Sequence, residues 1–205
     1  MSGSAWVFAR RGSGGSLALG GRLGGSQAGA RLRYRLVAER ARLALSGRVY
    51  APLQDFDAAE AAAGVEWQPS GRLPVRLLAE RRIAIGRDGR SAFSLIAYGG
   101  VGEQHLAGPL VANAYVQAGV VGLRSRDLFA DASLRLGIPV DDRVKIGGGA
   151  WAAAQPDVAR LDIGPQISWQ LPQIPGATLT ADWRFRIAGN AEPGSVPALT
   201  IATDF

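Results

Sequence analysis

The feature that most constrains this chain is an alternation of apolar and polar residues that recurs along its 205 residues. In residues 196–205, one face of an extended strand would carry Leu199, Ile201, Thr203 and Phe205. A period of two is that of a β-strand, whose successive side chains point to opposite faces, and no helix could gather such residues into one stripe. The chain is therefore expected to fold as a β protein.

The same period occurs upstream with bulkier and more charged residues. Residues 31–36 alternate arginine with leucine or tyrosine. Residues 161–171 and 179–187 alternate large apolar side chains with aspartate, glutamine, serine, threonine or arginine. An apolar face opposite a charged face, over segments of about ten residues, is typical of transmembrane β-strands.

The segments predict about twelve strands, an even number that suits an antiparallel barrel. We place them at residues 3–11, 24–36, 41–53, 58–69, 74–86, 90–103, 110–123, 127–139, 143–155, 159–172, 177–189 and 196–205. Most are long enough for a tilted strand to cross a bilayer, which needs about 9–11 residues. The expected fold is all-β: a single antiparallel transmembrane β-barrel domain over residues 1–205, with short turns except for a glycine-rich connection at residues 12–25.

The N-terminal segment does not fit a secreted protein. Residues 1–11 lack the apolar core of a signal peptide, and the sequence has no apolar run of eighteen residues that could form a transmembrane helix. We therefore expect either a start site upstream of Met1 or a longer polypeptide of which this chain is the C-terminal part.

The formal net charge is +6, almost all of it from arginine, and these arginines lie at alternate positions along strands. A nucleic-acid surface would gather them in a tail or interleave them with exposed aromatics, so a nucleic-acid partner is not expected. Inside a barrel, the predicted lumen-lining residues are Arg31, Arg33, Arg35, Arg42, Arg48, Glu60, Glu66, Arg76, Glu80, Arg82, Asp131, Arg135, Trp151, Asp162, Asp182, Arg184 and Arg186. Two interpretations stay open: a ladder of salt bridges that fills a small lumen, or a cationic constriction that selects anionic solutes.

Aromatic residues on the apolar face predict a belt at the membrane interface. The candidates are Tyr34, Trp67, Trp169, Trp183 and Phe185. Trp151 falls on the polar face instead, where we expect it to pack against an arginine side chain.

The sequence offers few residues that could form a catalytic site. His105 is the only histidine and lies in a segment that resembles a turn, residues 103–106, without partners for catalysis. Phosphate-binding, dinucleotide and calcium motifs are missing from the sequence, and it has no cysteine. We expect neither an enzyme nor a cofactor or bound metal.

The chain end, an alternating strand closed by Phe205, resembles the insertion signal of bacterial outer-membrane barrels, carried by Leu199, Ile201, Thr203 and Phe205. The stretches GGSQAG (24–29), GVEWQP (64–69) and AERR (79–82), with residues 182–205, resemble the C-terminal barrel of outer-membrane proteins that carry periplasmic tetratricopeptide repeats. That group includes the cellulose-synthase outer-membrane subunit and phage-adsorption proteins linked to exopolysaccharide.

This resemblance implies a passive conduit for exopolysaccharide export in the bacterial outer membrane. The partners that it implies are outer-membrane lipid, the barrel-assembly machinery, a polysaccharide and periplasmic repeat domains. The chain itself has no helical repeats and fewer strands than the sixteen expected of the cellulose exporter. A small diffusion pore and a non-conducting structural or receptor barrel remain alternatives, and a soluble β-barrel carrier is a less favoured one.

A membrane barrel predicts a simple biochemical result. The protein should be recovered in the outer-membrane fraction and should migrate differently in detergent gels before and after boiling, because a closed barrel resists detergent at low temperature. Recovery as a water-soluble monomer without detergent would contradict the prediction.

Overall fold

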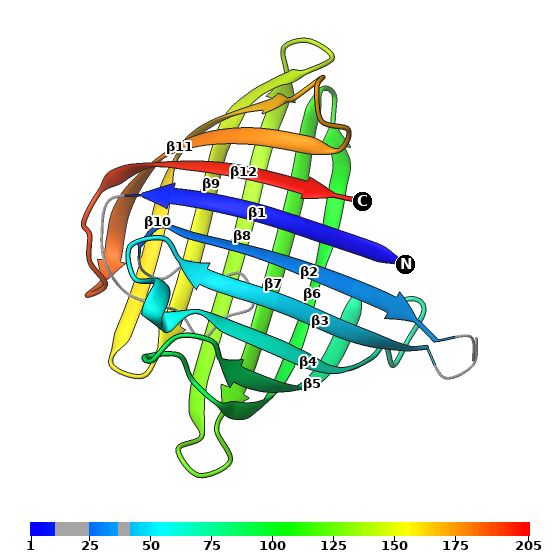
Figure 1. Cartoon of the computed structure of the whole chain (residues 1–205). Coiled ribbons are helices and arrows are strands. Elements are labelled where there is room, and N and C mark those ends of the chain that lie inside the picture. Colours follow the sequence, from blue (N-terminus) through cyan, green and yellow to red (C-terminus); the bar gives the residue numbers. More distant parts are fainter. Residues whose placement is uncertain (11–24, 37–41) are drawn as a thin grey trace.

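The alternating segments form twelve β-strands in the computed structural model, which describes residues 1–10, 25–36 and 42–205 (Figure 1). The strands are β1 (Ser2–Arg10), β2 (Gln27–Arg35), β3 (Leu43–Pro52), β4 (Glu60–Trp67), β5 (Val75–Ala84), β6 (Ala92–Ala107), β7 (Leu110–Val121), β8 (Asp127–Pro139), β9 (Val144–Gln155), β10 (Val158–Gln170), β11 (Ala177–Gly189) and β12 (Val196–Asp204). A short 3-10 helix, η1 (Phe56–Ala58), lies between β3 and β4. In the described parts of the chain, no helix is both long and apolar enough to cross a membrane.

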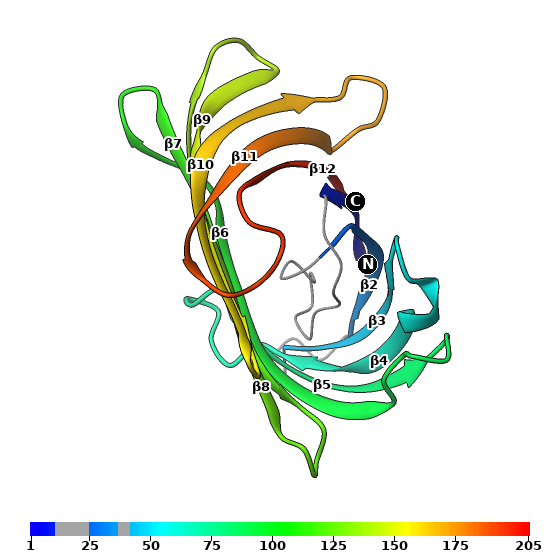
Figure 2. The ribbon, with the colours of Figure 1, turned by 90° about the vertical axis from the view of Figure 1, so that its left-hand side faces the viewer.

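Each strand pairs antiparallel with its neighbours in sequence, and β1 pairs with β12, so the sheet closes into a barrel. Figure 2 shows the resulting ring, in which β6–β10 form one long wall and β2–β5 part of the opposite one. The predicted fold class, an all-β antiparallel barrel of about twelve strands, is confirmed.

The two ends of the chain complete the closure. Gly3 and Phe205 exchange both backbone hydrogen bonds, at 2.5 and 2.9 Å. A Cβ atom at Gly3 would lie 2.4 Å from the Phe205 ring, which explains why glycine suits this position. We call the end of the barrel at which both termini lie the terminal end, and the opposite end the distal end (Figure 1).

The predicted strand boundaries agree with the structure to within a few residues, with one correction. Strand β6 continues to Ala107, beyond the predicted end at residue 103, so His105 lies in a strand and not in a turn. Two register shifts interrupt the pairing of β6 with β7 between Val101 and Ala107, and they bend the segment that resembled a turn. The predicted long connection at residues 12–25 lies almost entirely outside the described residues.

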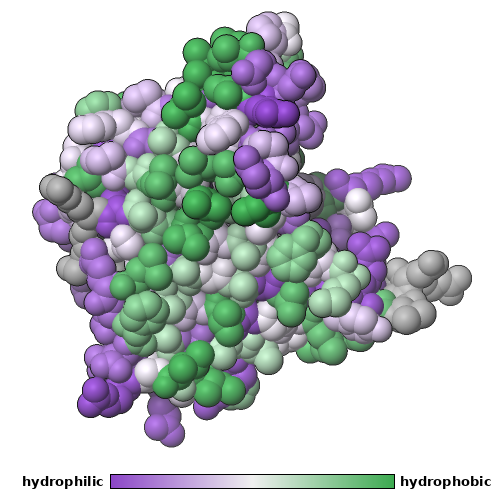
Figure 3. All heavy atoms as spheres, turned by 45° about the horizontal axis from the view of Figure 1, so that its top comes forward, coloured by the Kyte–Doolittle hydropathy of each residue, from purple (hydrophilic) through white to green (hydrophobic). Residues whose placement is uncertain are grey.

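The outer surface is apolar around the barrel. Large side chains that are at least two-fifths exposed occur on strand after strand; examples are Leu32, Val49, Val65, Leu95, Val116, Leu134, Ile146, Ile167 and Ile201. On the face seen in Figure 3, apolar side chains gather across the middle and hydrophilic ones toward the edges. An apolar outside around a charged inside reverses the arrangement of a soluble barrel and matches a protein that spans a bilayer.

The connection between β8 and β9, at the terminal end, is fixed by an aspartate. Asp141 Oδ1 accepts backbone hydrogen bonds from Arg143 and Val144, both at 2.7 Å. These two N–H groups lower the pKa of Asp141 below its ordinary value, because they stabilise the ionised carboxylate.

The backbone around Gly164 leaves no room for a side chain. With Pro165, it interrupts the pairing of β10 with β11, and a Cβ atom there would lie 1.7 Å from the backbone oxygen of Trp183. Gly164→Ala should destabilise the barrel by about 1–3 kcal/mol, the usual cost of overpacking. Urea unfolding, followed by the loss of the fast-migrating band in unboiled gels, would measure it.

Gly47→Ala is the matched control, because no atom lies within 4 Å of the position of a Cβ at Gly47. This variant should unfold at the same urea concentration as the wild type. Equal behaviour of the two variants would contradict the assigned close approach of β10 and β11.

Candidate functional site

The inward side chains of β2, β4, β5 and β6 meet around one carboxylate, that of Glu66, which is fully buried. Glu66 accepts hydrogen bonds from Arg31 Nη2 at 2.8 Å and Arg33 Nε at 2.5 Å, and Arg76 Nε lies 3.4 Å away. Tyr98 donates its hydroxyl to the same carboxylate and accepts a 2.7 Å hydrogen bond from Arg31. Because β2 and β6 are four strands apart in the barrel, the contact of Arg31 with Tyr98 crosses the lumen.

A second carboxylate, Glu80, organises the inward face of β3–β6 nearer the distal end. Arg48 donates two hydrogen bonds to it, at 2.7 and 3.2 Å, and Arg82 Nε donates one at 3.1 Å. Ser94 adds a hydrogen bond at 3.0 Å, and Glu60 lies 3.8 Å from Arg82. Two arginines around one buried carboxylate satisfy its oxygens, which a desolvated charge requires.

The third cluster joins β1 to β9–β11. Asp162 is fully buried and lies 2.5 Å from Arg160 Nε and 3.8 Å from Arg10 Nη1. The neighbouring pair is Arg184 with Asp182, at 3.1 Å. The contact of Arg10 with Asp162 joins two strands that are not neighbours, since β12 and β11 separate β1 from β10 in the ring.

Arg184 of this cluster lies between two inward aromatic rings. Its guanidinium is 4.3 Å from the ring centroid of Trp151 and 5.0 Å from that of Phe8. This arrangement agrees with the expected packing of Trp151 against an arginine and shows which arginine it is. All three side chains are buried, so they fill the lumen at this level.

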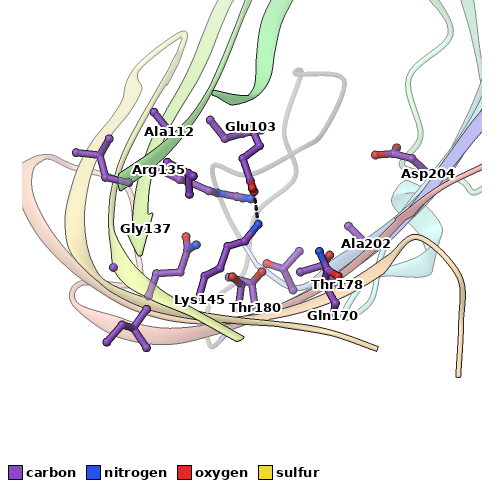
Figure 4. A pocket seen from close by; sticks show the side chains of 18 of the residues that line it. Glu103, Ala112, Arg135, Gly137, Lys145, Gln170, Thr178, Thr180, Ala202 and Asp204 are labelled. Carbon is purple, nitrogen blue, oxygen red and sulfur yellow. Dashed lines mark hydrogen bonds and ion pairs between the residues drawn. The ribbon is translucent and has the colours of Figure 1, made fainter. Parts of the chain in front are cut away.

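The inward face of β7–β12 near the terminal end is hollow instead. A cavity of about 310 Å³ lies there, lined by Arg135 and by polar residues that include Asn113, Gln166, Ser168, Gln170, Thr178 and Thr180. Figure 4 shows Lys145 reaching across the cavity to its ion-pair partner Glu103. Gln166 Oε1 and Thr200 Oγ1 are buried atoms without a hydrogen-bond partner among the described residues. The cavity thus offers two cations, Arg135 and Lys145, two carboxylates, Glu103 and Asp204, and two hydrogen-bonding atoms without a partner among the described residues.

Several sequence-predicted residues belong to no cluster. Asp131 is buried on β8, and Arg186 pairs with the exposed Glu192 at 3.5 Å. Arg42 is exposed at the terminal rim, and its prediction as a lumen residue needs correction. Arg35 is also exposed there, but it pairs with Ala44 in the inward register of Arg31 and Arg33, so its place in the lumen stays a prediction. The ladder of β2 and β3 ends at the pair of Arg35 with Ala44. Arg42 lies beyond this pair with a positive φ of 46°, so the inward alternation stops before Arg42.

The predicted aromatic belt divides into two groups, all of them outward-facing and about half exposed. Tyr34, Trp67 and Trp169 lie in the last two residues of β2, β4 and β10, at the terminal end. Trp183 and Phe185 lie midway along β11 instead, with ring centroids 6.2 Å apart. Trp183 pairs with Pro197 near the distal end of β12, and the place of both residues in an interfacial belt stays a prediction.

The sequence interpretation missed several inward residues, among them Phe8, Arg10, Tyr98 and Arg160. Arg10 and Arg160 continue the inward alternation of β1 and β10 and could have been found by extending it. Phe8 and Tyr98 were hidden because an apolar or aromatic residue on the polar face of a strand gives no signal of its own.

At the distal rim, three exposed carboxylates come together, those of Asp55, Asp57 and Asp88, with oxygens within 4.8 Å of one another. Asp57 pairs with Arg87 at 3.5 Å. An exposed acidic cluster of this kind is no sign of a bound ion.

No protein-family model matches the sequence, and no curated protein sequence matches it. Solved structures of similar fold include a KdgM porin, with 8% identity, a TM-score of 0.49 and coverage of 100% of this chain and 99% of that one. An outer membrane channel from Pseudomonas putida F1 has 12% identity, a TM-score of 0.48 and coverage of 100% and 94%. Wzi of Escherichia coli, a carbohydrate-binding barrel involved in capsule assembly, has 13% identity, a TM-score of 0.41 and coverage of 88% and 51%. These likenesses concern the course of the chain in a barrel and say nothing about its activity.

The Glu66 cluster predicts a large loss of stability on neutralisation. Glu66→Gln would leave the guanidinium groups of Arg31, Arg33 and Arg76 facing one another without their shared anion. Removing one partner of a buried ion pair costs about 3–5 kcal/mol. Urea unfolding of the folded barrel in lipid or detergent would measure this loss.

Glu192→Gln is the matched control, because Glu192 is 76% exposed and, within the described residues, forms its ion pair with Arg186. An exposed pair is worth about 0–1 kcal/mol, so this variant should behave nearly as the wild type. Equal loss of stability in the two variants would contradict the role of Glu66 as the centre of the network.

Proposed function

We propose that this protein is an outer-membrane β-barrel that acts as a narrow, anion-favouring channel. Its outward surface is apolar around the ring, and its strands have 8 to 16 residues, against about 9–11 needed to cross a bilayer. A closed barrel with an even number of strands is the form of bacterial outer-membrane proteins. These features support the outer-membrane location, with lipid and the barrel-assembly machinery as partners.

The observation that carries the proposal is the polar cavity inside the lumen at the terminal end. Its volume of about 310 Å³ is at the lower limit of small-molecule sites, which have about 300–1,000 Å³. Arg135 and Lys145 line it together with the carboxylates of Glu103 and Asp204, and hydroxyl and amide side chains complete the wall. This lining suits a small hydrated or hydroxylated solute.

The charges of the lumen support a preference for anions. Glu66 is surrounded by three arginines, and Glu80 and Asp162 by two each. The Glu66 and Asp162 clusters therefore keep a net positive charge, whereas Arg48 and Arg82 are balanced by Glu80 and Glu60. Fixed charges of one sign set the selectivity of a pore. In this proposal the buried clusters narrow the lumen beyond the cavity, so a conducting path requires small solutes or a shift of these side chains.

Exopolysaccharide export, the function implied by the family resemblance, is a more demanding version of the same proposal. A polymer would need the third cluster to open, since Arg184, Trp151 and Phe8 fill the lumen there. Periplasmic repeat domains would be its partners. A non-conducting structural barrel is the opposite alternative, in which all three clusters stay closed and catalysis plays no part.

Planar bilayer recordings test the channel. The purified barrel should conduct, and its reversal potential in a KCl gradient should show a preference for chloride. Arg135→Glu should shift this potential toward cations, because it reverses a charge on the cavity wall. Arg87→Glu is the matched control, since Arg87 is 89% exposed in a distal loop, and it should leave the potential nearly unchanged.

Silent bilayers with correctly folded protein would overturn the channel and leave the structural barrel. Conductance that falls when a soluble polysaccharide is added on one side would favour the exporter. Equal shifts for Arg135→Glu and Arg87→Glu would remove the cavity wall as the source of selectivity.

A further inference from the structure

One charged residue faces outward on this otherwise apolar barrel. Along the regularly paired parts of the described strands, Arg81 is the only charged residue on the outward face, between Ala79 and Ile83 of β5. The other arginines of the described strands face the lumen or lie at strand ends. A cation on the lipid-facing surface is costly in hydrocarbon and far less so near a membrane interface. Its retention there needs a physical reason.

The surroundings of Arg81 satisfy the guanidinium only in part. Its Cζ atom lies 4.8 Å from the ring centroid of Phe93, which is half exposed on β6. A ring face attracts the charge but accepts no strong hydrogen bond, and the guanidinium has five N–H donors. Among the described residues, no carboxylate pairs with Arg81.

Arg81 lies at the distal rim of the barrel. The ladder of β5 and β6 ends one residue later, at the pair of Arg82 with Ala92. The carbonyl oxygen of Phe93 accepts a hydrogen bond from Gly122 at 2.8 Å, and that of Gly122 accepts one from Arg126 at 3.1 Å. These two backbone hydrogen bonds connect Phe93, whose ring contacts Arg81, through Gly122 to Arg126. Arg126 is a second exposed arginine at the same rim.

An apolar groove on the outer surface includes Arg126 in its lining. Its volume is about 940 Å³, and it runs over the outer face of β6–β9. Its lining includes Ala118, Ala130 and Ala154, with Leu95 and Leu128 as larger, exposed neighbours, and Arg126 at the distal rim. Small residues beside large ones make a trough on a surface that faces lipid tails. A trough of this kind fits a hydrocarbon chain whose polar head lies at the rim.

We propose that Arg81 and Arg126 bind the phosphate of a phosphorylated outer-leaflet lipid whose acyl chain lies in the groove over β6–β9. Guanidinium and phosphate form paired, charge-assisted hydrogen bonds, which would supply the acceptors that Phe93 does not. The inference rests on the outer-membrane location proposed above, with the distal end toward the outer leaflet. It is independent of whether the lumen conducts.

Lipid binding to the folded barrel in a neutral detergent tests the site. The probes are diphosphorylated lipid A, the same lipid after removal of its phosphates, and inorganic phosphate, each titrated and detected by native mass spectrometry. The wild type should retain diphosphorylated lipid A and lose most of this retention with the dephosphorylated form. Inorganic phosphate should bind far more weakly, because it cannot occupy the groove.

Arg81→Gln should weaken binding of diphosphorylated lipid A about tenfold, since one charge-assisted hydrogen-bonding group is worth roughly a factor of ten. Arg126→Gln should weaken it in the same direction. Arg87→Gln is the matched control at the same end and should bind as the wild type does. Heat modifiability of each variant verifies that it is folded.

Equal binding by Arg81→Gln and the wild type would overturn the proposal, as would equal retention of lipid A with and without its phosphates. Inorganic phosphate binding as tightly as lipid A would also overturn it, because the groove would then contribute nothing. A barrel that binds lipid but is silent in planar bilayers would leave this site standing and refute only the channel. A protein that never inserts into a membrane would refute both.

Discussion

The rest of the structure depends on the backbone hydrogen bonds between β1 and β12. Within a bilayer no water is available to unpaired N–H and C=O groups, so a sheet can cross only if it has no free edge. The paired bonds of Gly3 and Phe205 mark the end of the closing ladder. Once the ring is closed, the alternation of each strand places its apolar side chains toward lipid and nearly all of its charged side chains toward the lumen.

Closure also decides how the buried charges are satisfied. Twelve strands form a ring narrow enough for side chains of distant strands to touch, as Arg31 of β2 does with Tyr98 of β6. Buried carboxylates such as Glu66 and Glu80 thereby gain several arginine partners, which isolated strand pairs could not provide. Near the terminal end of β7–β12, small and hydroxyl-bearing residues replace arginines and aromatics, and the lumen there is hollow. The size of the inward side chains therefore decides which regions of the lumen are filled and which are hollow.

Arginine side chains on the inside and on the outside of the barrel both need anionic partners, and they find them in different places. Inward arginines find carboxylates within the protein, and around Glu66 and Asp162 they outnumber these carboxylates, which is the basis of the proposed preference for anions. Arg81 faces outward, where the protein offers it only the Phe93 ring. We therefore propose that a membrane lipid supplies the anion for Arg81 and that a solute passes through the lumen. The two proposals share the location of the barrel and nothing else.

The sequence by itself determined the strands, their number and the face that most strand side chains occupy, because alternation is a local property with a period of two. It also predicted Trp151 against an arginine and most of the buried arginines and carboxylates. It did not predict which of them meet, since partners such as Arg10 and Asp162 lie far apart in the chain and are brought together only by register and closure. For the same reason it assigned Arg42 to the lumen, although the ladder ends before that residue. Only the tertiary structure decided where the lumen is filled, where it is open, and which arginine within the described strands faces outward.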